Sequence, residues 1–486
     1  MIACLMFCIA IASATAPAPA RTDSAKQMFQ QVDVFISGRD GYAAYRIPAI
    51  ETAPDGSLLA FAEGRKYNMA DPGFEKQEID LVMKRSVDRG ATWSAMTIVE
   101  HAGERWSAAN PCTLVDSKTH TVWLFYLRGR PGRNTYSARP GTDDVRILAR
   151  TSRDNGITWS EPIDLTSATR DMSDPNWHCS VIGPGGGIQT RRGRLLIPVW
   201  RYAPWGVCAA YSDDHGRTWK RGEFVPNVEG DECQLVELAD GRILFDIRQQ
   251  KGANRYRALS SDGGQTWSQP RRGETVTPVC CAIQRLTRRP GGDNRNRLLW
   301  TGPKGPDRRN LVARLSYDEG ETFTREREIA SGFAAYSDIA LLKDKTAGIL
   351  WERGETAGYQ FISFTRLNRA WLEEPESKNA YKKRPRTPNS GGDRAFRSGR
   401  PPGIGGGGGE FDLFIHFLIE AEPLAGMTDA EARNWATDYG KQRWDRSRLK
   451  QCLSEAFAWG REHRIPLYCG DLGIYALNAP SESRKN

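Results

Sequence analysis

A short turn motif that recurs along the chain constrains the fold more than any other feature of the sequence. The motif Ser-x-Asp-x-Gly-x-Thr, followed by Trp or Phe, predicts a tight turn between two strands, because Asp accepts hydrogen bonds from turn amides and Gly tolerates a positive φ. Thr favours the returning strand, and the aromatic ring favours a core position. The five copies lie at residues 86–93, 152–159, 212–219, 260–267 and 316–323.

Apolar runs between the copies predict short strands. These runs lie at residues 57–61, 122–126, 195–199 and 243–245, and their length and spacing favour strands over helices. The copies recur about every fifty to sixty residues, which suits one four-stranded blade with long loops. The sequence therefore predicts an all-β fold, a six-bladed β-propeller, over residues 29–374.

Residues 1–20 predict a signal peptide. An apolar run from residue 2 to residue 12 precedes small residues and Ala18-Pro19-Ala20, which resembles a cleavage site. The run is too short for a transmembrane helix, and no later segment predicts a membrane span. We therefore expect a secreted or periplasmic protein, in a compartment that permits disulfides. Most of the eight cysteines beyond this segment are expected to be small buried hydrophobic residues.

A basic segment at residues 375–410 predicts a linker. The whole chain carries a net charge of +9, and six of those charges lie at residues 377–410, where eight Lys or Arg residues face two acidic ones. The segment is rich in Gly and Pro and lacks an interleaved aromatic platform, which favours a solvated linker over a nucleic-acid-binding face. We therefore expect no nucleic-acid partner.

The last part of the chain, residues 411–486, predicts a short α/β segment. Residues 446–463 place apolar side chains on one helical face, and residues 465–469 follow as a strand. Residues 464–475 resemble the end of cellulase-like barrel glycosidases, with Asp471 where those enzymes place a nucleophilic glutamate. A complete barrel needs about 200 residues, so we interpret the segment as a remnant without activity or as a small accessory module.

The recurring turns resemble the Asp boxes of the sialidase superfamily. Members of that superfamily are six-bladed propellers whose boxes lie away from the active-site face, so the resemblance implies a structural role for the boxes. It covers about residues 30–373. Three further segments carry it: Tyr45-Arg46-Ile47-Pro48, residues 231–238 with 246–248, and Ala335-Tyr336-Ser337-Asp338.

The resemblance also implies an active site. Tyr336 would be the nucleophile, Glu232 the base that activates it, and Asp71, in a loop before the first box, the acid and base for the leaving group and water. The other implied residues bind the substrate. Arg46, Arg248 and Arg308 (or its neighbour Arg309) would hold a carboxylate, Glu352 would orient Arg46, and Arg65 would contact a ring substituent.

These residue types fit the chemistry of sialic acid. Its carboxylate lies directly on the anomeric carbon, so recognition favours planar guanidinium groups that bind it in a bidentate manner. The same carboxylate would repel an Asp or Glu nucleophile, and sialidases with a tyrosine nucleophile are the recognised exception among retaining glycosidases. A free tyrosine ionises at about pH 10, so it needs a neighbouring base such as Glu232.

The sequence thus predicts a retaining exo-α-sialidase that acts on sialylated glycoconjugates. No metal or other cofactor is expected, because the six histidines show no ligand spacing. Three alternatives stay open: an inactive Asp-box propeller that binds glycans, a propeller glycosidase that cleaves a neutral polysaccharide with two carboxylates, and a trans-sialidase. A glycosidase for neutral polysaccharides would have no substrate carboxylate for three arginines to bind. The glycine-rich residues 183–187 predict a turn, with the rim of the pocket as the alternative.

Overall fold

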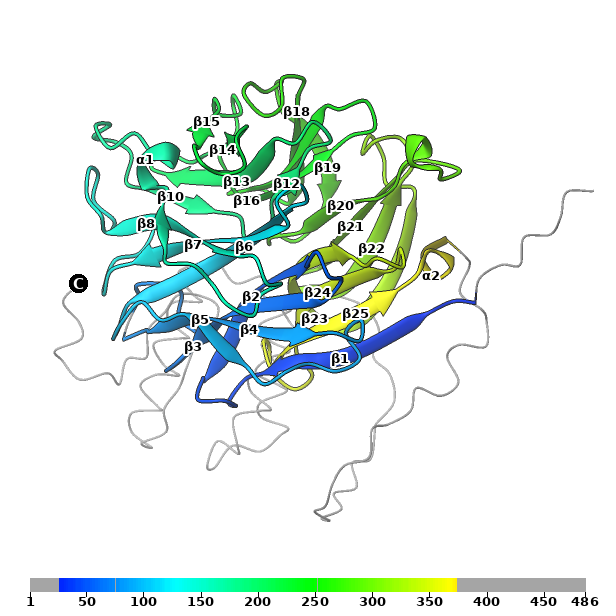
Figure 1. Cartoon of the computed structure of the whole chain (residues 1–486), viewed down its shortest axis with the longest axis horizontal. Helices are drawn as coiled ribbons and strands as arrows, with labels where there is room; N and C mark the ends of the chain where they lie inside the picture. The colour runs from blue at the N-terminus through cyan, green and yellow to red at the C-terminus, as the bar shows by residue number, and fades with distance from the viewer. Residues whose placement is uncertain (1–25, 75, 251, 374–486) are drawn as a thin grey trace, which may run out of the picture. The chain divides into compact units, whose positions relative to one another are not determined.

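Strands make up nearly all of the regular structure. The structure, a computed structural model, describes residues 26–74, 76–250 and 252–373 (Figure 1). Within those residues the all-β prediction is confirmed. Helical turns there are short: α1 (Thr166–Thr169), α2 (Arg369–Glu373) and the 3-10 turn η1 (Arg289–Gly291).

Three predicted segments lie outside the described residues: the signal peptide at 1–20, the linker at 375–410 and the α/β segment at 411–486. In the part that is described, none of the helices has the length and apolar character that a membrane crossing requires. Its cysteines are free and buried, as expected for small hydrophobic residues. They are Cys112, Cys179, Cys208, Cys233, Cys280 and Cys281.

The strands form four hydrogen-bonded sheets, of which the largest has nine strands. Its main path runs from β2 through β3, β4, β6, β7 and β8 to β9, while β5 pairs with β4 and β11 pairs with β6. The bounds are β2 (Ala44–Thr52), β3 (Leu58–Arg65), β4 (Ile79–Ser86), β5 (Thr97–Glu100), β6 (Ser107–Asp116), β7 (Thr121–Gly129), β8 (Val145–Ser152), β9 (Ile163–Asp164) and β11 (Gly185–Gly186).

Two smaller sheets follow along the chain, with five and four strands. In the first, β13 pairs with β10, β12 and β14, and β14 pairs with β15; in the second, β16 to β19 pair in sequence order. The bounds are β10 (Cys179–Ile182), β12 (Ile188–Gln189), β13 (Leu195–Tyr202), β14 (Gly206–Ser212), β15 (Lys220–Arg221), β16 (Gly230–Glu237), β17 (Ile243–Gln249), β18 (Asn254–Ser260) and β19 (Arg271–Thr275).

The remaining sheet has seven strands and joins both ends of the described chain. Figure 1 shows β1, in dark blue, beside β25, in yellow, and the two strands pair antiparallel. An early strand therefore completes the last sheet. The bounds are β1 (Phe29–Ile36), β20 (Ala282–Thr287), β21 (Arg297–Pro303), β22 (Arg309–Ser316), β23 (Arg325–Leu341), β24 (Ala347–Arg353) and β25 (Phe361–Leu367).

Each recurring motif forms the turn that the sequence predicts. In the copy at 152–159, Ser152 Oγ donates to Asp154 and accepts from the Gly156 amide at 2.8 Å each, and Thr158 donates both its amide and its hydroxyl to Asp154. The glycine has a second reason besides its positive φ, because a Cβ at Gly156 would lie 2.8 Å from Leu59 of β3. The turn thus packs closely on another part of the sheet.

The inner strands of the sheets bring the candidate residues together. β2 contacts β6 and β23, while β16 contacts β13 and β20. The side chains of β2, of β16 and of residues 334–340 in β23 are almost entirely buried, including polar residues that an isolated strand would expose to water. Because buried polar groups need partners, these inner strands are where non-local hydrogen bonds are expected.

Candidate active site

A cavity lined by charged side chains receives residues from all four sheets. Seven of the eight predicted site residues line it; Glu352, the eighth, does not. Arg308 lines it, whereas its alternative Arg309 is exposed to solvent at the start of β22. The seven are Arg46, Arg65, Asp71, Glu232, Arg248, Arg308 and Tyr336.

The phenol of Tyr336 points at the carboxylate of Glu232. Tyr336 Oη lies 2.7 and 2.6 Å from the two carboxylate oxygens, although the residues are 104 positions apart in the sequence. Arg248 Nη1 donates to Tyr336 Oη at 3.1 Å and also to Glu232 Oε2. The phenol proton therefore has an acceptor beside it, and the guanidinium can stabilise negative charge on either oxygen.

Burial raises the pKa of Tyr336 well above that of a free tyrosine, and the negative charge of Glu232 raises it further. Arg248, Arg308 and Arg46 oppose that shift. The resting side chain is therefore a neutral phenol that donates to a carboxylate. Such a pair can supply an oxygen nucleophile only if the proton leaves toward Glu232 during attack.

Glu352 lies outside the cavity lining and bonds to two residues that line it, Arg46 and Tyr336. This side chain is fully buried and accepts from Arg46 Nε at 2.6 Å. It also accepts the backbone amides of Ile47 at 2.9 Å and Tyr336 at 3.1 Å. Glu352 therefore orients Arg46 and fixes the backbone of Tyr336, and its position in the structure leaves it out of contact with a ligand in the cavity.

A tyrosine that the sequence analysis did not single out holds two of the arginines. The Arg46 guanidinium lies over the Tyr359 ring, 3.9 Å from its centroid, and Arg308 Nη1 donates to Tyr359 Oη. Arg308 also lies 5.6 Å from the centroid of the Tyr336 ring. Tyr359 has a positive φ of 59°, which is uncommon for this residue type, but no sequence signal indicated the contact.

Asp71 and Arg65 form an ion pair at the edge of the cavity. Arg65 Nη2 lies 2.9 Å from Asp71 Oδ1 and 2.7 Å from Glu63 Oε2, and the Arg65 side chain is buried. The Asp71 side chain is 65% exposed. Burial would raise the pKa of Asp71, but Arg65, Arg46 and Arg308 together lower it. Arg65 thus holds the Asp71 loop against β3, so its role extends beyond the predicted contact with a ligand.

A second carboxylate beside Glu232 was not assigned by the sequence. Asp231 is 5% exposed and lines the cavity. Its Oδ1 lies 3.7 Å from Arg248 Nε, and its Oδ2 accepts from Gln250 Nε2. Burial, together with the charge of Glu232, raises the pKa of Asp231. Asp231 directly precedes Glu232, and Gln250 lies two residues after Arg248. This closeness to assigned residues is the sequence feature that could have indicated Asp231 as a site residue.

Aromatic side chains form one wall of the cavity. Tyr136 makes edge contacts with Trp205, 6.3 Å between ring centroids, and with Phe74, 6.5 Å. Tyr136 is 58% exposed, and Trp200 and Trp205 also line the cavity. Such rings can pack against the apolar face of a sugar. No motif in the sequence linked these residues, because they come from separate loops and strands.

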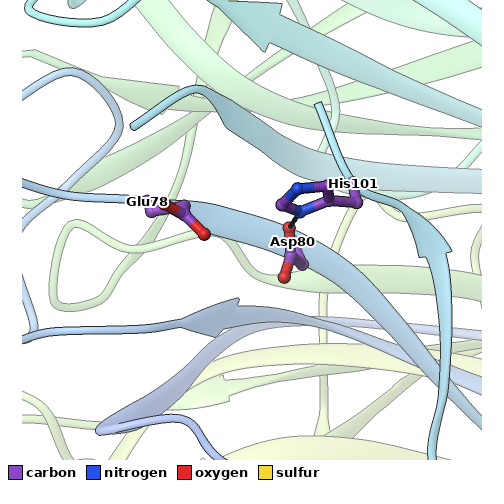
Figure 2. A group of neighbouring side chains, drawn as sticks. All are labelled: Glu78, Asp80 and His101. Atoms are coloured by element: carbon purple, nitrogen blue, oxygen red, sulfur yellow. Dashed lines mark hydrogen bonds and ion pairs between the residues drawn. The ribbon is translucent and has the colours of Figure 1, made fainter. Parts of the chain in front are cut away.

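One group of possible metal ligands lies among the described residues, and it fits a cation poorly. Figure 2 shows Glu78, Asp80 and His101, whose ligand atoms lie within 4.8 Å of one another. Their oxygens already have donors: Lys66 Nζ lies 2.6 Å from Glu78 Oε1, and His101 Nδ1 lies 2.8 Å from Asp80 Oδ1. The other two oxygens accept from the Arg105 amide and from Tyr42. Lys66 therefore already pairs with Glu78, and all four carboxylate oxygens have a bonding partner.

Comparisons with known proteins agree on one family. The model of the BNR repeat-like domain matches residues 56–350. A sialidase of Micromonospora viridifaciens is 33% identical over 74% of this chain and 56% of its own length, and Sialidase-2 of Mus musculus is 30% identical over 67% and 93%. The solved Hadza microbial sialidase Hz136 has 25% identity and a TM-score of 0.61, covering 69% of this chain and 68% of that one.

The chain spans little more than half the length of the Micromonospora relative, at 56%. The matched region nevertheless contains the recurring turns and, of the eight predicted site residues, all except Arg46 and Glu352. The alignment with the mouse relative covers nearly the whole of that protein. Together these matches show that the chain belongs to the sialidase family and carries its BNR repeat-like domain.

Proposed function

We propose that the protein is an exo-α-sialidase that removes terminal sialic acid from glycoconjugates with retention of configuration. The observation that carries this proposal is the contact of Tyr336 Oη with Glu232 at 2.6 and 2.7 Å in a cavity that Arg46, Arg248 and Arg308 also line. A carboxylate nucleophile would repel the carboxylate of sialic acid, whereas a neutral phenol would not.

The substrate carboxylate would bind Arg46, Arg248 and Arg308. All three line the cavity, and a guanidinium binds a carboxylate through two parallel hydrogen bonds. Arg46 is held by Glu352, and Arg308 by Tyr359, so both guanidinium groups are oriented before the substrate arrives. Such preorganisation lowers the entropic cost of binding.

In the first half-reaction Tyr336 Oη bonds to the anomeric carbon while its proton passes to Glu232. The bond from that carbon to the leaving oxygen breaks, and protonated Asp71 gives its proton to the leaving oxygen. In the second half-reaction Asp71 takes a proton from water, the water oxygen bonds to the anomeric carbon, and the bond to Tyr336 breaks. Glu232 then returns its proton to Tyr336. Two inversions give net retention.

Asp71 must be protonated to act as the acid, although its pKa is lowered in the free protein. Two of the groups that lower it, Arg46 and Arg308, are the groups that would pair with the substrate carboxylate. A bound carboxylate would offset their positive charge, so substrate binding would raise the pKa of Asp71. The proposed mechanism therefore favours an acidic working range.

A direct assay tests the proposal. The protein should release a fluorescent aglycone from an α-sialoside and should leave the matching α-glucoside intact. A fluorinated sialosyl fluoride should label Tyr336, because its fluorine slows the second step while fluoride leaves readily in the first. A label on Glu232, or no turnover and no label, would contradict the proposal.

The alternatives give different results in the same assay. A glycan-binding propeller without activity would bind sialosides but release no aglycone. A trans-sialidase would share the first half-reaction and then pass the sugar to an added acceptor, which product analysis with lactose present would detect. A propeller glycosidase for neutral polysaccharides gives no reason for three arginines in one cavity.

We also propose that the four sheets correspond to six blades and that the protein is exported. Two observations support the blade count. β4 and β6 pair at a single position, Ile79 with Ser107. β23 pairs first with β22, through Arg325–Phe333, and then with β24, through Ala334–Leu341. Each of the two larger sheets would then divide into two blades. Export rests on the predicted signal peptide, and the proposed extracellular substrates agree with it.

A further inference from the structure

A second hydrogen-bonded pair lies two residues along the strands from Tyr336 and Glu232. Gln234 Nε2 donates to Asp338 Oδ1 at 2.9 Å, and both side chains are buried. Gln234 and Glu232 lie on β16, and Asp338 and Tyr336 lie on β23. Two residues of a strand span about 7 Å, so the same two strands are joined by two successive side-chain pairs.

The second pair also connects two further inner strands. Asp338 Oδ2 accepts the Ile50 amide of β2 at 2.9 Å, and Gln234 Oε1 accepts the Ile283 amide of β20 at 3.1 Å. Each side-chain oxygen of the pair therefore has a donor, and the Gln234 amide cannot rotate without losing one bond. The pair fixes the relative positions of β2, β16, β20 and β23.

The glycine-rich residues 183–187 close over this pair. A Cβ at Gly185 would lie 2.0 Å from Gln234 Nε2 and 3.0 Å from Asp338 Oδ1, so no larger residue fits there. Gly185 pairs with Cys112 of β6 and has a φ of 102°, which L residues rarely adopt. The segment thus packs against the buried pair. Its closeness to the pair explains the glycine at this position, which the sequence assigned to a turn.

We propose that Gln234 and Asp338 are positioning residues that set the separation between Tyr336 Oη and Glu232 for nucleophilic attack, and this inference rests on the proposed function. β23 carries Tyr336 and β16 carries Glu232, so the spacing of these strands decides whether the phenol proton can pass to the carboxylate. A displacement of about 1 Å in such a contact can cost about a hundredfold in rate. Two of the three arginines that would bind the substrate carboxylate, Arg46 and Arg308, have supports outside this pair, Glu352 and Tyr359.

Exchanging the two functional groups gives a sharp test. Gln234→Glu places two carboxylates face to face, and Asp338→Asn places two amide NH2 groups face to face, because both carbonyl oxygens are held by backbone amides. The double variant restores one carboxylate and one amide with the hydrogen bond reversed, and it can keep both backbone bonds. Each single change should therefore disturb the strand spacing, and the double change should restore it.

The expected readout is a loss in kcat. Each single variant should lose about 10- to 100-fold in kcat on an α-sialoside with KM changed less than about threefold, because Arg46 and Arg308 keep their own supports at the carboxylate site. The double variant should recover kcat to within about threefold of the unmodified protein. If the single variants do not fold, the double variant decides: recovery of folding and kcat supports the inference, and a folded double variant with low kcat overturns it.

The chain offers a control pair outside the cavity lining. Gln189 Nε2 donates to Asp116 Oδ1 at 2.8 Å, and Gln189 Oε1 accepts the Ser117 amide at 2.9 Å, so this glutamine, like Gln234, joins a carboxylate to a backbone amide; it also accepts from the Ser117 hydroxyl. Neither residue lines the cavity. Gln189→Glu should lower the melting temperature and leave kcat unchanged. An equal loss of kcat in Gln189→Glu and Gln234→Glu would show a general effect of instability and would overturn the inference.

Crystal structures of the variants separate this inference from the proposed function. The distance from Tyr336 Oη to Glu232 should lengthen in Gln234→Glu and return in the double variant, whatever the protein hydrolyses. If the unmodified protein releases no aglycone, the proposed function is wrong. The distance from Tyr336 Oη to Glu232 in the variants still tests the positioning role in that case. An unchanged distance in a folded single variant overturns the inference, as does a loss confined to KM.

Discussion

The recurring turns and the cavity use carboxylates in opposite ways. In the turn at 152–159, Asp154 takes its hydrogen bonds from Ser152 and Thr158, all within six consecutive residue steps. In the cavity region, Glu352 bonds to Arg46, 306 positions away, and Glu232 bonds to Tyr336, 104 positions away. The turn satisfies its carboxylate locally, whereas Glu352 and Glu232 meet these partners only after distant strands have come together.

The carboxylates of the turns and of the cavity region also differ in burial. Asp154 lies on a half-exposed turn, whereas Glu352 is fully buried and Glu232 is 8% exposed. Burying a carboxylate is unfavourable in free energy unless charged or hydrogen-bonding partners surround it, so removing one partner destabilises the folded protein. Changes in the cavity should therefore affect activity strongly, and changes in the turns should affect stability alone.

Tyr336→Phe should have the largest effect. The change removes one oxygen and keeps the buried ring, so folding should survive, while kcat on α-sialosides with poor leaving groups should fall by about a thousandfold or more. Tyr359→Phe is the matched control, because it removes the same group from a ring that contacts Arg46 and Arg308. Its loss should be at most about tenfold. Similar losses in both variants would remove Tyr336 from the role of nucleophile.

Arg248→Lys should have the next largest effect. A lysine keeps the charge but cannot bond to Glu232, to Tyr336 and to a substrate carboxylate at once, so kcat/KM should fall by about a hundredfold. Arg150→Lys is the control from outside the cavity, since Arg150 bonds to Glu100 at 2.6 Å. It should lower the melting temperature without loss of kcat/KM. Near-normal affinity of Arg248→Lys for a sialic-acid transition-state analogue would contradict the assigned contact.

The same contrast explains how much the sequence could predict. The turns depend on residues inside one eight-residue motif, so pattern reasoning identified all five copies and the roles of their Asp and Gly residues. Tyr336, Glu232 and the arginines came from motif resemblance, and the structure brings them into one cavity. The residues next to Tyr336 and Glu232 in the sequence do not indicate that these two side chains meet. The resemblance to a known family was needed to predict this pair.

Tyr359, Gln234 and Asp338, which the sequence analysis missed, take part in contacts between distant parts of the chain. Tyr359 supports arginines more than fifty positions away, and Gln234 meets Asp338 at a distance of 104 positions. Both Gln234 and Asp338 stand inside the quoted motifs, yet strand order alone does not say which polar residues face each other. The assignment of 183–187 to a turn failed to indicate its contact with this pair for the same reason.

Arg65→Gln should have a smaller effect on rate and a visible effect on pH dependence. Arg65 is one of the groups that lower the pKa of Asp71, so its removal should raise that pKa. An acid catalyst acts when protonated, and kcat/KM therefore falls as pH rises through the pKa of the free protein. The fall should occur at higher pH in the variant, with a loss of about tenfold at the optimum. An unshifted pH profile in a folded variant would show that Arg65 does not set the pKa of the acid catalyst.

Asp154→Ala should have the smallest effect on activity. It removes the acceptor for Ser152 and for both donors of Thr158, and because this turn is half-exposed, water can replace part of what is lost. The free energy of unfolding should fall by about 1 kcal/mol, measured by urea denaturation, with kcat within about twofold of the unmodified protein. Ser152→Ala should give a similar stability loss, because its hydroxyl bonds to both Asp154 and the Gly156 amide. A loss of kcat without a loss of stability would mean that this turn communicates with the cavity, and the division between local turns and a non-local site would then be wrong.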